Sequence, residues 1–393
     1  MIQSIYINNF KSYLEFSTEL SPVTIIAGDN GSGKSSFLQA LAFLKAACTG
    51  SVYNFLDARN LEVNDIVSNV APKLTKIITF SLEFAFPSGS ELQWDITFIT
   101  ERSKNKIALR SEQVADIRTE EIYLSYDSTG GQRINEKTGS KEPLPAGTYD
   151  ASLMKIIDIK QKELFPHLFA IRNFFENTEV LDLLNPRQMR RSSRVSNRAL
   201  GEYGEKLPSL IYLLSREEKD EIRKNLQKLL PNLSDVDSSV GRAGWTRLAT
   251  KENYQGLDHS ITVPAGDISD GTLRLIALFS IQSLNHSGGA LLLDEVEDGI
   301  NARNLEAVLK FFQEYQKQKN QQIIITTHSS ILLDYADPEM ILCFLRDDVG
   351  RTICFHMEDS SLLREKLEFL YPGEALTSLS KEEWSKASEE QET

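Results

Sequence analysis

The sequence predicts an α/β fold with a parallel core sheet, an antiparallel β subdomain and an inserted helical subdomain. Residues 28–35 have the spacing G-x-x-x-x-G-K-[ST], between a β-compatible run at 23–26 and a helix-compatible run at 36–42. Two short apolar runs, at 290–293 and 323–326, alternate with segments of helical pattern. Continuously apolar strands between helices are typical of a parallel sheet whose two faces are both covered.

The composition is that of an ordinary globular protein. The chain has 393 residues, 41% hydrophobic and 25% charged, and its net charge of −13 excludes a molecule that is basic throughout and coats nucleic acid. Three scattered cysteines without C-x-x-C spacing argue against a disulfide framework or a zinc site. The N-terminus lacks a signal-peptide core, and no run approaches the about 18–20 apolar residues of a membrane helix. We therefore expect a soluble cytoplasmic protein without membrane contact.

Residues 1–150 are predicted to form the N-terminal half of the core together with the antiparallel subdomain. The segment 130–145 is polar and contains Gly and Pro, which predicts a long loop or a projecting hairpin. Alternating apolar residues predict strands in this half, at 2–7, 13–20, 76–86, 91–100, 106–110 and 120–126.

Residues 151–255 are predicted to be a helical insertion, because apolar residues recur at helical spacing in 153–159 and 209–230. Residues 256–379 form the predicted C-terminal half of the core. The end of the chain, 380–393, is polar and acidic and is predicted to be a solvated tail. The elements expected in the C-terminal half are strands at 260–264, 290–293 and 323–326 and helices at 272–284, at 302–319 and from near Ser329.

The G-x-x-x-x-G-K-[ST] segment predicts a phosphate-binding loop. Its glycines let the backbone approach phosphate oxygens closely, and the loop amides and the helix N-terminus point at the anion. Lys34 is placed to reach the β- and γ-phosphates, and the Ser35 hydroxyl to ligate Mg²⁺. The predicted binding residues are Gly28, Asp29, Asn30, Gly31, Ser32, Gly33, Lys34 and Ser35.

Polar residues follow both apolar runs of the C-terminal half. Asp294 and Glu295 end the first run, and the carboxyl ends of parallel strands are where ligands bind in α/β sheets. We expect Asp294 to hold Mg²⁺ and Glu295 to act as the general base that polarises the attacking water. His328 follows the second run, 34 residues after Asp294, and is predicted to contact the γ-phosphate.

Two other features have a structural and a functional interpretation. Ser269, Asp270 and Gly271 open a predicted helix, and by themselves they indicate only a capped helix start. A run of arginines would share one face if its segment were helical, and could then bind nucleic acid or an acidic partner. A solvated face neutralised by nearby acids is an equally good interpretation. The run consists of Arg187, Arg190, Arg191, Arg194 and Arg198.

In this order, the motifs resemble the ABC-type ATPase head of SMC and RecF-like proteins. More narrowly, they resemble stand-alone AAA-labelled ATPases related to the overcoming-lysogenization-defect (OLD) family. The resemblance rests on IYINNFKSY at 5–13, LPSLIYLL at 207–214 and ISDGTLRL at 268–275. It implies that the Walker A loop extends to Ser36, that Asp294 and Glu295 are the Walker B acids, and that His328 is the switch histidine. Residues 269–271 would be a signature that contacts the γ-phosphate held by a second copy.

The resemblance also implies function. Such heads bind ATP and Mg²⁺ and close as head-to-tail dimers with two composite sites. OLD nucleases carry a Toprim domain, but only about sixty-five residues follow His328, below the roughly 100 of a usual domain. The hypothesis is therefore an ATPase switch or scaffold of bacterial anti-phage defence that acts with a separate effector, possibly a nuclease. The alternative is a RecF-like DNA-repair ATPase that acts directly on DNA.

Overall fold

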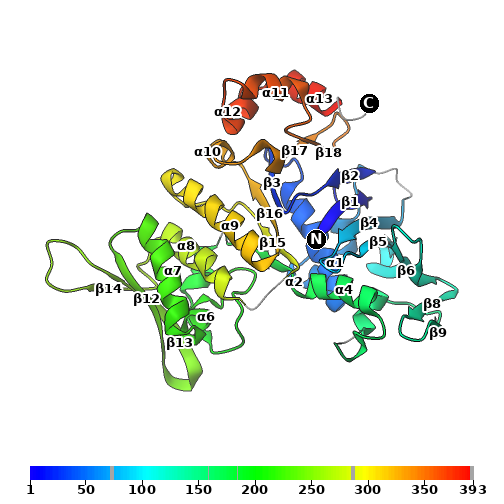
Figure 1. Ribbon diagram of the computed structural model, residues 1–393, viewed down its shortest axis with the longest axis horizontal. Helices are drawn as coiled ribbons and strands as arrows, with labels where there is room; N and C mark the ends of the chain where they lie inside the picture. The colour runs from blue at the N-terminus through cyan, green and yellow to red at the C-terminus, as the bar shows by residue number, and fades with distance from the viewer. Residues whose placement is uncertain (71–74, 158, 184, 285–287, 390–393) are drawn as a thin grey trace.

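The computed structural model describes residues 1–70, 75–157, 159–183, 185–284 and 288–389. A six-stranded sheet forms the centre, in the order β10–β15–β16–β3–β17–β18 (Figure 1). The strands from β10 to β17 are parallel, and β18 is antiparallel to β17. The predicted parallel core sheet is therefore confirmed. Its strands are β10 (Glu179–Leu181), β15 (Ala290–Leu293), β16 (Gln322–Thr327), β3 (Val23–Gly28), β17 (Ile341–Arg346) and β18 (Thr352–His356).

Both faces of this sheet are buried, which explains the continuous apolar runs. On one face Leu292 and Ile324 pack in a core shared with helix α1 (Lys34–Thr49) and the antiparallel sheet. On the other face their neighbours Leu291 and Ile323 pack against α8 (Asp270–Ser280) and α9 (Leu305–Lys319). Alternate residues of each strand thus belong to two separate cores.

The antiparallel subdomain is one eight-stranded sheet, in the order β2–β1–β4–β5–β6–β7–β8–β9. The segment predicted as a loop or hairpin forms the hairpin β8–β9. In β4 and β5 buried residues alternate with less buried ones, because only one face packs on the core. The strands are β1 (Ile2–Asn8), β2 (Phe16–Glu19), β4 (Ile77–Ala85), β5 (Glu91–Glu101), β6 (Lys106–Asp116), β7 (Ile122–Asp127), β8 (Gly130–Asn135) and β9 (Ser140–Leu144).

A buried glutamate ties this sheet to the following segment. Glu112 on β6 is 1% exposed, and its carboxylate accepts hydrogen bonds from Trp94 Nε1 at 2.9 Å, Ser152 Oγ at 2.5 Å and Leu153 N at 2.7 Å. Burial, which disfavours the charged carboxylate, raises the pKa of Glu112 to about 7 despite these three donors.

The segment 151–255 is not purely helical, and that prediction needs correction. Strand β10 joins the central sheet, and β12 and β13 form a hairpin that projects with β14 from the lower left of Figure 1. The helices between are α4 (Pro166–Glu176), α5 (Pro186–Arg190), α6 (Leu207–Leu213) and α7 (Arg216–Leu229). The strands within this segment are β11 (Ser193–Arg194), β12 (Leu233–Val240) and β13 (Trp245–Glu252). Strand β14 (Ile261–Pro264) follows it and confirms the strand expected at 260–264.

The expectation of a solvated acidic tail is also wrong for most of its length. Lys381–Glu389 forms helix α13, with Ala387 buried and the Trp384 ring 5.8 Å from that of Phe355. Residues 390–393 lie outside the described part. None of the helices among the described residues is long and apolar enough to cross a membrane. The remaining helices are α2 (Val52–Ala58), α3 (Val63–Ile66), α10 (Ser330–Asp334), α11 (Ser361–Leu367) and α12 (Pro372–Thr377).

Candidate nucleotide-binding site

The loop of the G-x-x-x-x-G-K-[ST] motif connects β3 to α1, as predicted. All three of its glycines, Gly28, Gly31 and Gly33, have positive φ, and at two of them an added Cβ would also clash with neighbouring atoms. Gly28 has φ +150°, and an added Cβ would lie 2.1 Å from the carbonyl oxygen of Phe344. Gly33 has φ +118°, and its Cβ would lie 2.4 Å from Thr352 Oγ1. The motif therefore fits this loop because the backbone is both left-handed and closely packed.

Three side chains from other parts of the sequence fix the backbone of the loop through hydrogen bonds to its carbonyl oxygens. Tyr13 donates its hydroxyl to the Gly33 carbonyl at 2.7 Å, and Thr352 Oγ1 donates to the Ser32 carbonyl at 2.8 Å. Arg346, at the end of β17, donates from Nε to the Gly31 carbonyl at 2.7 Å. Three consecutive carbonyl oxygens are thus fixed by the surrounding protein. The supporting role of these three residues was not predicted from the sequence.

Lys34 lies at the centre of the site and is 4% exposed. Its Nζ donates to the carbonyl oxygens of Gly28 at 2.8 Å and Asp29 at 2.9 Å, and lies 3.3 Å from His328 Nδ1. Burial lowers the pKa of Lys34, and the nearby Glu295 carboxylate acts in the opposite direction. The ammonium therefore connects the loop to the carboxyl end of β16.

The carboxyl ends of the parallel strands bring the predicted metal ligands together. Ser35 Oγ donates to Asp294 Oδ1 at 3.0 Å, and Thr326 Oγ1 donates to the same oxygen at 2.5 Å. Because β3, β16 and β15 are neighbours, the start of α1 lies beside the end of β15. A hydroxyl and a carboxylate at one point are hard oxygen donors of the kind that Mg²⁺ prefers.

Glu295 has an unusual backbone conformation. Its φ is +44°, in the left-handed region that non-glycine residues rarely adopt. The amide of Glu295 donates to Thr326 Oγ1 at 2.9 Å, and its Oε1 lies 3.1 Å from His328 Nε2. Thr326 thus contacts both acids. Strained backbone held in place by its surroundings is typical of functional sites.

A third acid, missed in the sequence analysis, supports His328. Glu297 Oε1 accepts hydrogen bonds from Thr327 Oγ1 at 2.8 Å and from the His328 amide at 2.7 Å. Its position two residues after Glu295 is the sequence signal that could have identified it. Glu297 therefore fixes the backbone at the point where the histidine leaves β16.

The predicted signature residues lie elsewhere. Ser269 caps α8 by accepting from the Thr272 amide at 3.2 Å, and a Cβ on Gly271 would lie 2.3 Å from the Gly299 carbonyl oxygen. The neighbouring Arg274 pairs with Asp298, with a nitrogen–oxygen distance of 2.5 Å. Within the described ranges, no hydrogen bond or ion pair joins 269–271 to 28–36. The chain thus presents these residues separately from its own phosphate loop.

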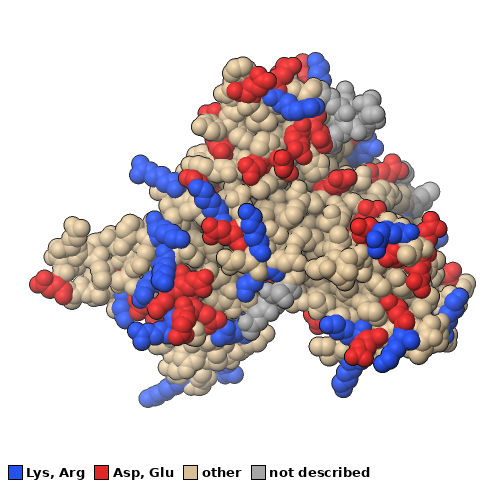
Figure 2. Space-filling view, in the orientation of Figure 1, with Lys and Arg blue, Asp and Glu red and all other residues tan. Residues whose placement is uncertain are grey.

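The five arginines do not form the single helical face that would have supported nucleic-acid binding. Helix α5 ends at Arg190, after Pro186 at its start, and β11 follows at once. Arg198 pairs with Glu218 at 2.6 Å, and the Arg194 guanidinium lies over the Trp245 ring at 5.5 Å. Figure 2 shows Lys and Arg interspersed with Asp and Glu on the visible face.

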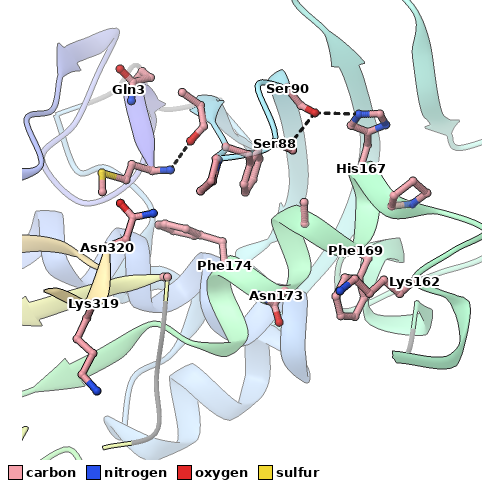
Figure 3. Close-up of a pocket in the computed structure, with 18 residues that line it drawn as sticks. Gln3, Ser88, Ser90, Lys162, His167, Phe169, Asn173, Phe174, Lys319 and Asn320 are labelled. Carbon is pink, nitrogen blue, oxygen red and sulfur yellow. Dashed lines mark hydrogen bonds between the residues drawn. The ribbon is translucent and has the colours of Figure 1, made fainter. Parts of the chain in front are cut away.

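Two cavities differ in their relation to this site. One of about 440 Å³ is lined by Ser35 and Asp294 together with Asp182 and Glu202. A larger one, of about 820 Å³, is lined by residues that include Gly289 and Asn320 and is shown in Figure 3. Because these two residues precede β15 and β16, the larger cavity lies at the amino ends of the core strands. None of the motif residues lines it.

Comparison with known families shows to which family the chain belongs. Residues 23–334, from β3 to α10, match the family described as "AAA domain, putative AbiEii toxin, Type IV TA system". The chain belongs to this AAA family. One relative is a protein named ATP/GTP phosphatase from Helicobacter pylori, 21% identical over 88% of this chain and 93% of that protein. Another is the energy-coupling factor transporter ATP-binding protein EcfA2 of Spiroplasma kunkelii, 29% identical over 25% of this chain and 34% of that protein.

Solved structures show the same fold for this AAA family member. The Smc head bound to the C-winged helix domain of ScpA matches with a TM-score of 0.57 at 16% identity, covering 91% of this chain and 98% of that one. A Smc head with an extended coiled coil, bound to the C-terminal domain of ScpA derived from Pyrococcus furiosus, matches with a TM-score of 0.55 at 15% identity, covering 93% and 99%. The chain is an ATPase of this AAA family and has the ABC-type P-loop fold.

Proposed function

We propose that this protein is an ATP-hydrolysing molecular switch whose sites are completed between two copies. The observation that carries the proposal is the convergence of Lys34, Ser35, Asp294, Glu295 and His328 at the carboxyl ends of β3, β15 and β16. This arrangement supports roles for these residues as a phosphate-binding loop, as oxygen ligands of a metal ion and as a base near the terminal phosphate.

Mg²⁺ fits the donor set. Ser35 and Asp294 are the residues that would hold it, since their oxygens already lie 3.0 Å apart. When bound, the ion offsets negative charge on the phosphate oxygens of the nucleotide.

The chain's own residues account for the other steps. Gly28 to Ser36 bind the phosphates, and Lys34 exchanges its contacts with the loop carbonyls for phosphate oxygens. Glu295 orients a water and takes its proton as the water oxygen bonds to the γ-phosphorus, while the bond from that phosphorus to the β–γ bridging oxygen breaks and ADP leaves. His328, held by its contact with Glu295, donates to a γ-phosphate oxygen.

The signature residues 269–271 require a partner under this proposal. They make no polar contact with the phosphate loop within the described part of the same chain. The amino end of α8, a favourable place for an anion, is exposed at Ser269 and Asp270. A head-to-tail dimer would bring them to the γ-phosphate of the second copy. The two Smc heads of similar fold are each bound to a domain of ScpA, which supports the expectation that this chain also works through protein partners.

We place the switch in bacterial anti-phage defence, in the cytoplasm, acting on a separate effector such as a nuclease. The family description, which names a toxin and a TA system, supports this setting. Direct action on DNA has less support, since the net charge is −13 and three of the five arginines in 187–198 contact an acid or a tryptophan.

Two variants test the proposal. Lys34→Ala should abolish binding of ATP, because the loop loses its cation. Glu295→Gln should keep ATP binding but stop hydrolysis and accumulate ATP-bound dimers, which light scattering would detect as twice the 44.3 kDa of one chain. Glu297 provides the matched control: Glu297→Gln changes a nearby acid but keeps an acceptor for the His328 amide. Hydrolysis at the normal rate by Glu295→Gln, or an ATP-bound monomer, would contradict the proposal.

A further inference from the structure

The signature loop carries an acid at the position where it should receive a phosphate. Asp270 is the first residue of α8 and is exposed, with Ser269 as the helix cap. A carboxylate there repels a γ-phosphate, and it also competes with that phosphate for the positive end of the helix. The proposed dimer therefore needs a device that removes the effect of this charge.

Arg190 forms an ion pair with Asp270 that offsets this negative charge. It is the last residue of α5, and its Nη2 donates both to the Asp270 carboxylate and, at 2.7 Å, to the carbonyl oxygen of Ile268. A single guanidinium thus neutralises the acid and holds the backbone two residues before it. The contact joins residues 80 positions apart, so it depends on the fold.

The helix that carries Arg190 is anchored in the core. Met189, the preceding residue, is 0% exposed, and a Cβ on Gly204 would lie 2.6 Å from its Cγ. Arg274 on α8, 5% exposed, donates from Nε to the Leu183 carbonyl just before α5 at 2.9 Å. The positions of α5 and α8 are therefore fixed relative to each other, and the Arg190 side chain has a rigid base.

We infer that Arg190 is a positioning residue that holds the Asp270 carboxylate toward α5, so that the signature loop can accept the terminal phosphate of ATP bound to a second copy. The inference rests on the proposed function. It names a residue whose effect passes through Asp270 and not through direct contact with the nucleotide. The consequence lies in ATP-dependent dimerisation, which a pair that only stabilises the fold would leave unchanged: removing the acid should there compensate for removing the arginine.

The experiment uses the full chain with Glu295→Gln as parent and measures ATP-dependent dimerisation by analytical ultracentrifugation. Adding Arg190→Gln, which removes the charge but keeps a donor for Ile268, should weaken the dimer about tenfold. Adding Asp270→Asn to that variant should restore the parent affinity. Arg191→Gln, a change of the exposed neighbouring arginine, is the matched control and should leave dimerisation unchanged.

Other outcomes separate the hypotheses. An unchanged dimer with Arg190→Gln, or no rescue by Asp270→Asn, would overturn the role of Arg190, whereas a parent that stays monomeric with ATP would overturn the proposed function itself. Asp270→Asn alone provides a test that does not depend on the folding of Arg190→Gln. It should dimerise at least as tightly as the parent, because the acid that Arg190 holds is then absent, and a weaker dimer would refute the inference.

Discussion

Substitution of Thr326 tests the geometry of the site, because its one hydroxyl contacts both Asp294 and Glu295. Its Oγ1 donates to Asp294 at 2.5 Å and accepts from the Glu295 amide at 2.9 Å, and the residue is 0% exposed. Thr326→Val keeps the shape but removes both hydrogen bonds. A bond to a charged group is worth about 1.5–3 kcal/mol, and a partly buried amide left without an acceptor costs about 1–3 kcal/mol. We expect a stability loss of about 2–4 kcal/mol after relaxation of the site.

The functional effect should exceed the stability effect. Glu295 sits in a strained conformation, and an error of about 1 Å in a catalytic group can lower the rate about 100-fold. We expect kcat to fall by about that factor while the Kd for ATP changes little. Thr246→Val is the control, since Thr246 is equally buried and donates at 2.6 Å to the Ser193 carbonyl, in a different sheet. It should lose stability but retain kcat. Normal turnover by Thr326→Val at a temperature where it is folded would refute the reasoning.

Three further predictions concern neighbouring groups. Glu297→Ala should lower kcat with little change in ATP affinity, because the His328 amide loses its acceptor, and steady-state kinetics on Glu297→Gln should show most of the activity restored. Gly33→Ala should abolish ATP binding in a calorimetric titration, since the added Cβ meets Thr352. Because burial raises the pKa of Glu112 to about 7, the folded chain holds that proton more tightly than the unfolded chain. Stability in urea should therefore fall by about 3 kcal/mol as the pH rises from about 4.5 to about 7, and Glu112→Gln should remove this dependence.

The parts of the site carried by contiguous motifs were predictable. The loop spacing around Lys34 leaves few alternatives, and apolar runs that end in Asp294 or His328 place these residues at one sheet edge by the rule for parallel strands. The supporting contacts were not predictable in the same way. Thr352 and Arg346 reach the loop from more than 300 residues away, and nothing in their local sequence marks them.

The errors in the fold have physical causes. Strand β10 has three residues and is a strand only because it pairs with β15, and β12 is too polar to show clear alternation. The acidic composition of α13 led to the prediction of a solvated tail, although Trp384 and Ala387 pack on the core. The arginine run was predicted to share a face on the assumption of one continuous helix, but α5 ends at Arg190 and the chain then forms the strand β11. In each case tertiary contacts override local composition.

A mixing experiment tests the central claim, that each site is shared between two copies, most directly. One variant carries Lys34→Ala and keeps its signature, and the other carries Ser269→Arg and keeps its phosphate loop. Each alone should hydrolyse no ATP. In a mixture, the dimer that contains one of each has one site built from two intact halves, so we predict that ATP hydrolysis returns. A mixture as inactive as its components would contradict the shared site.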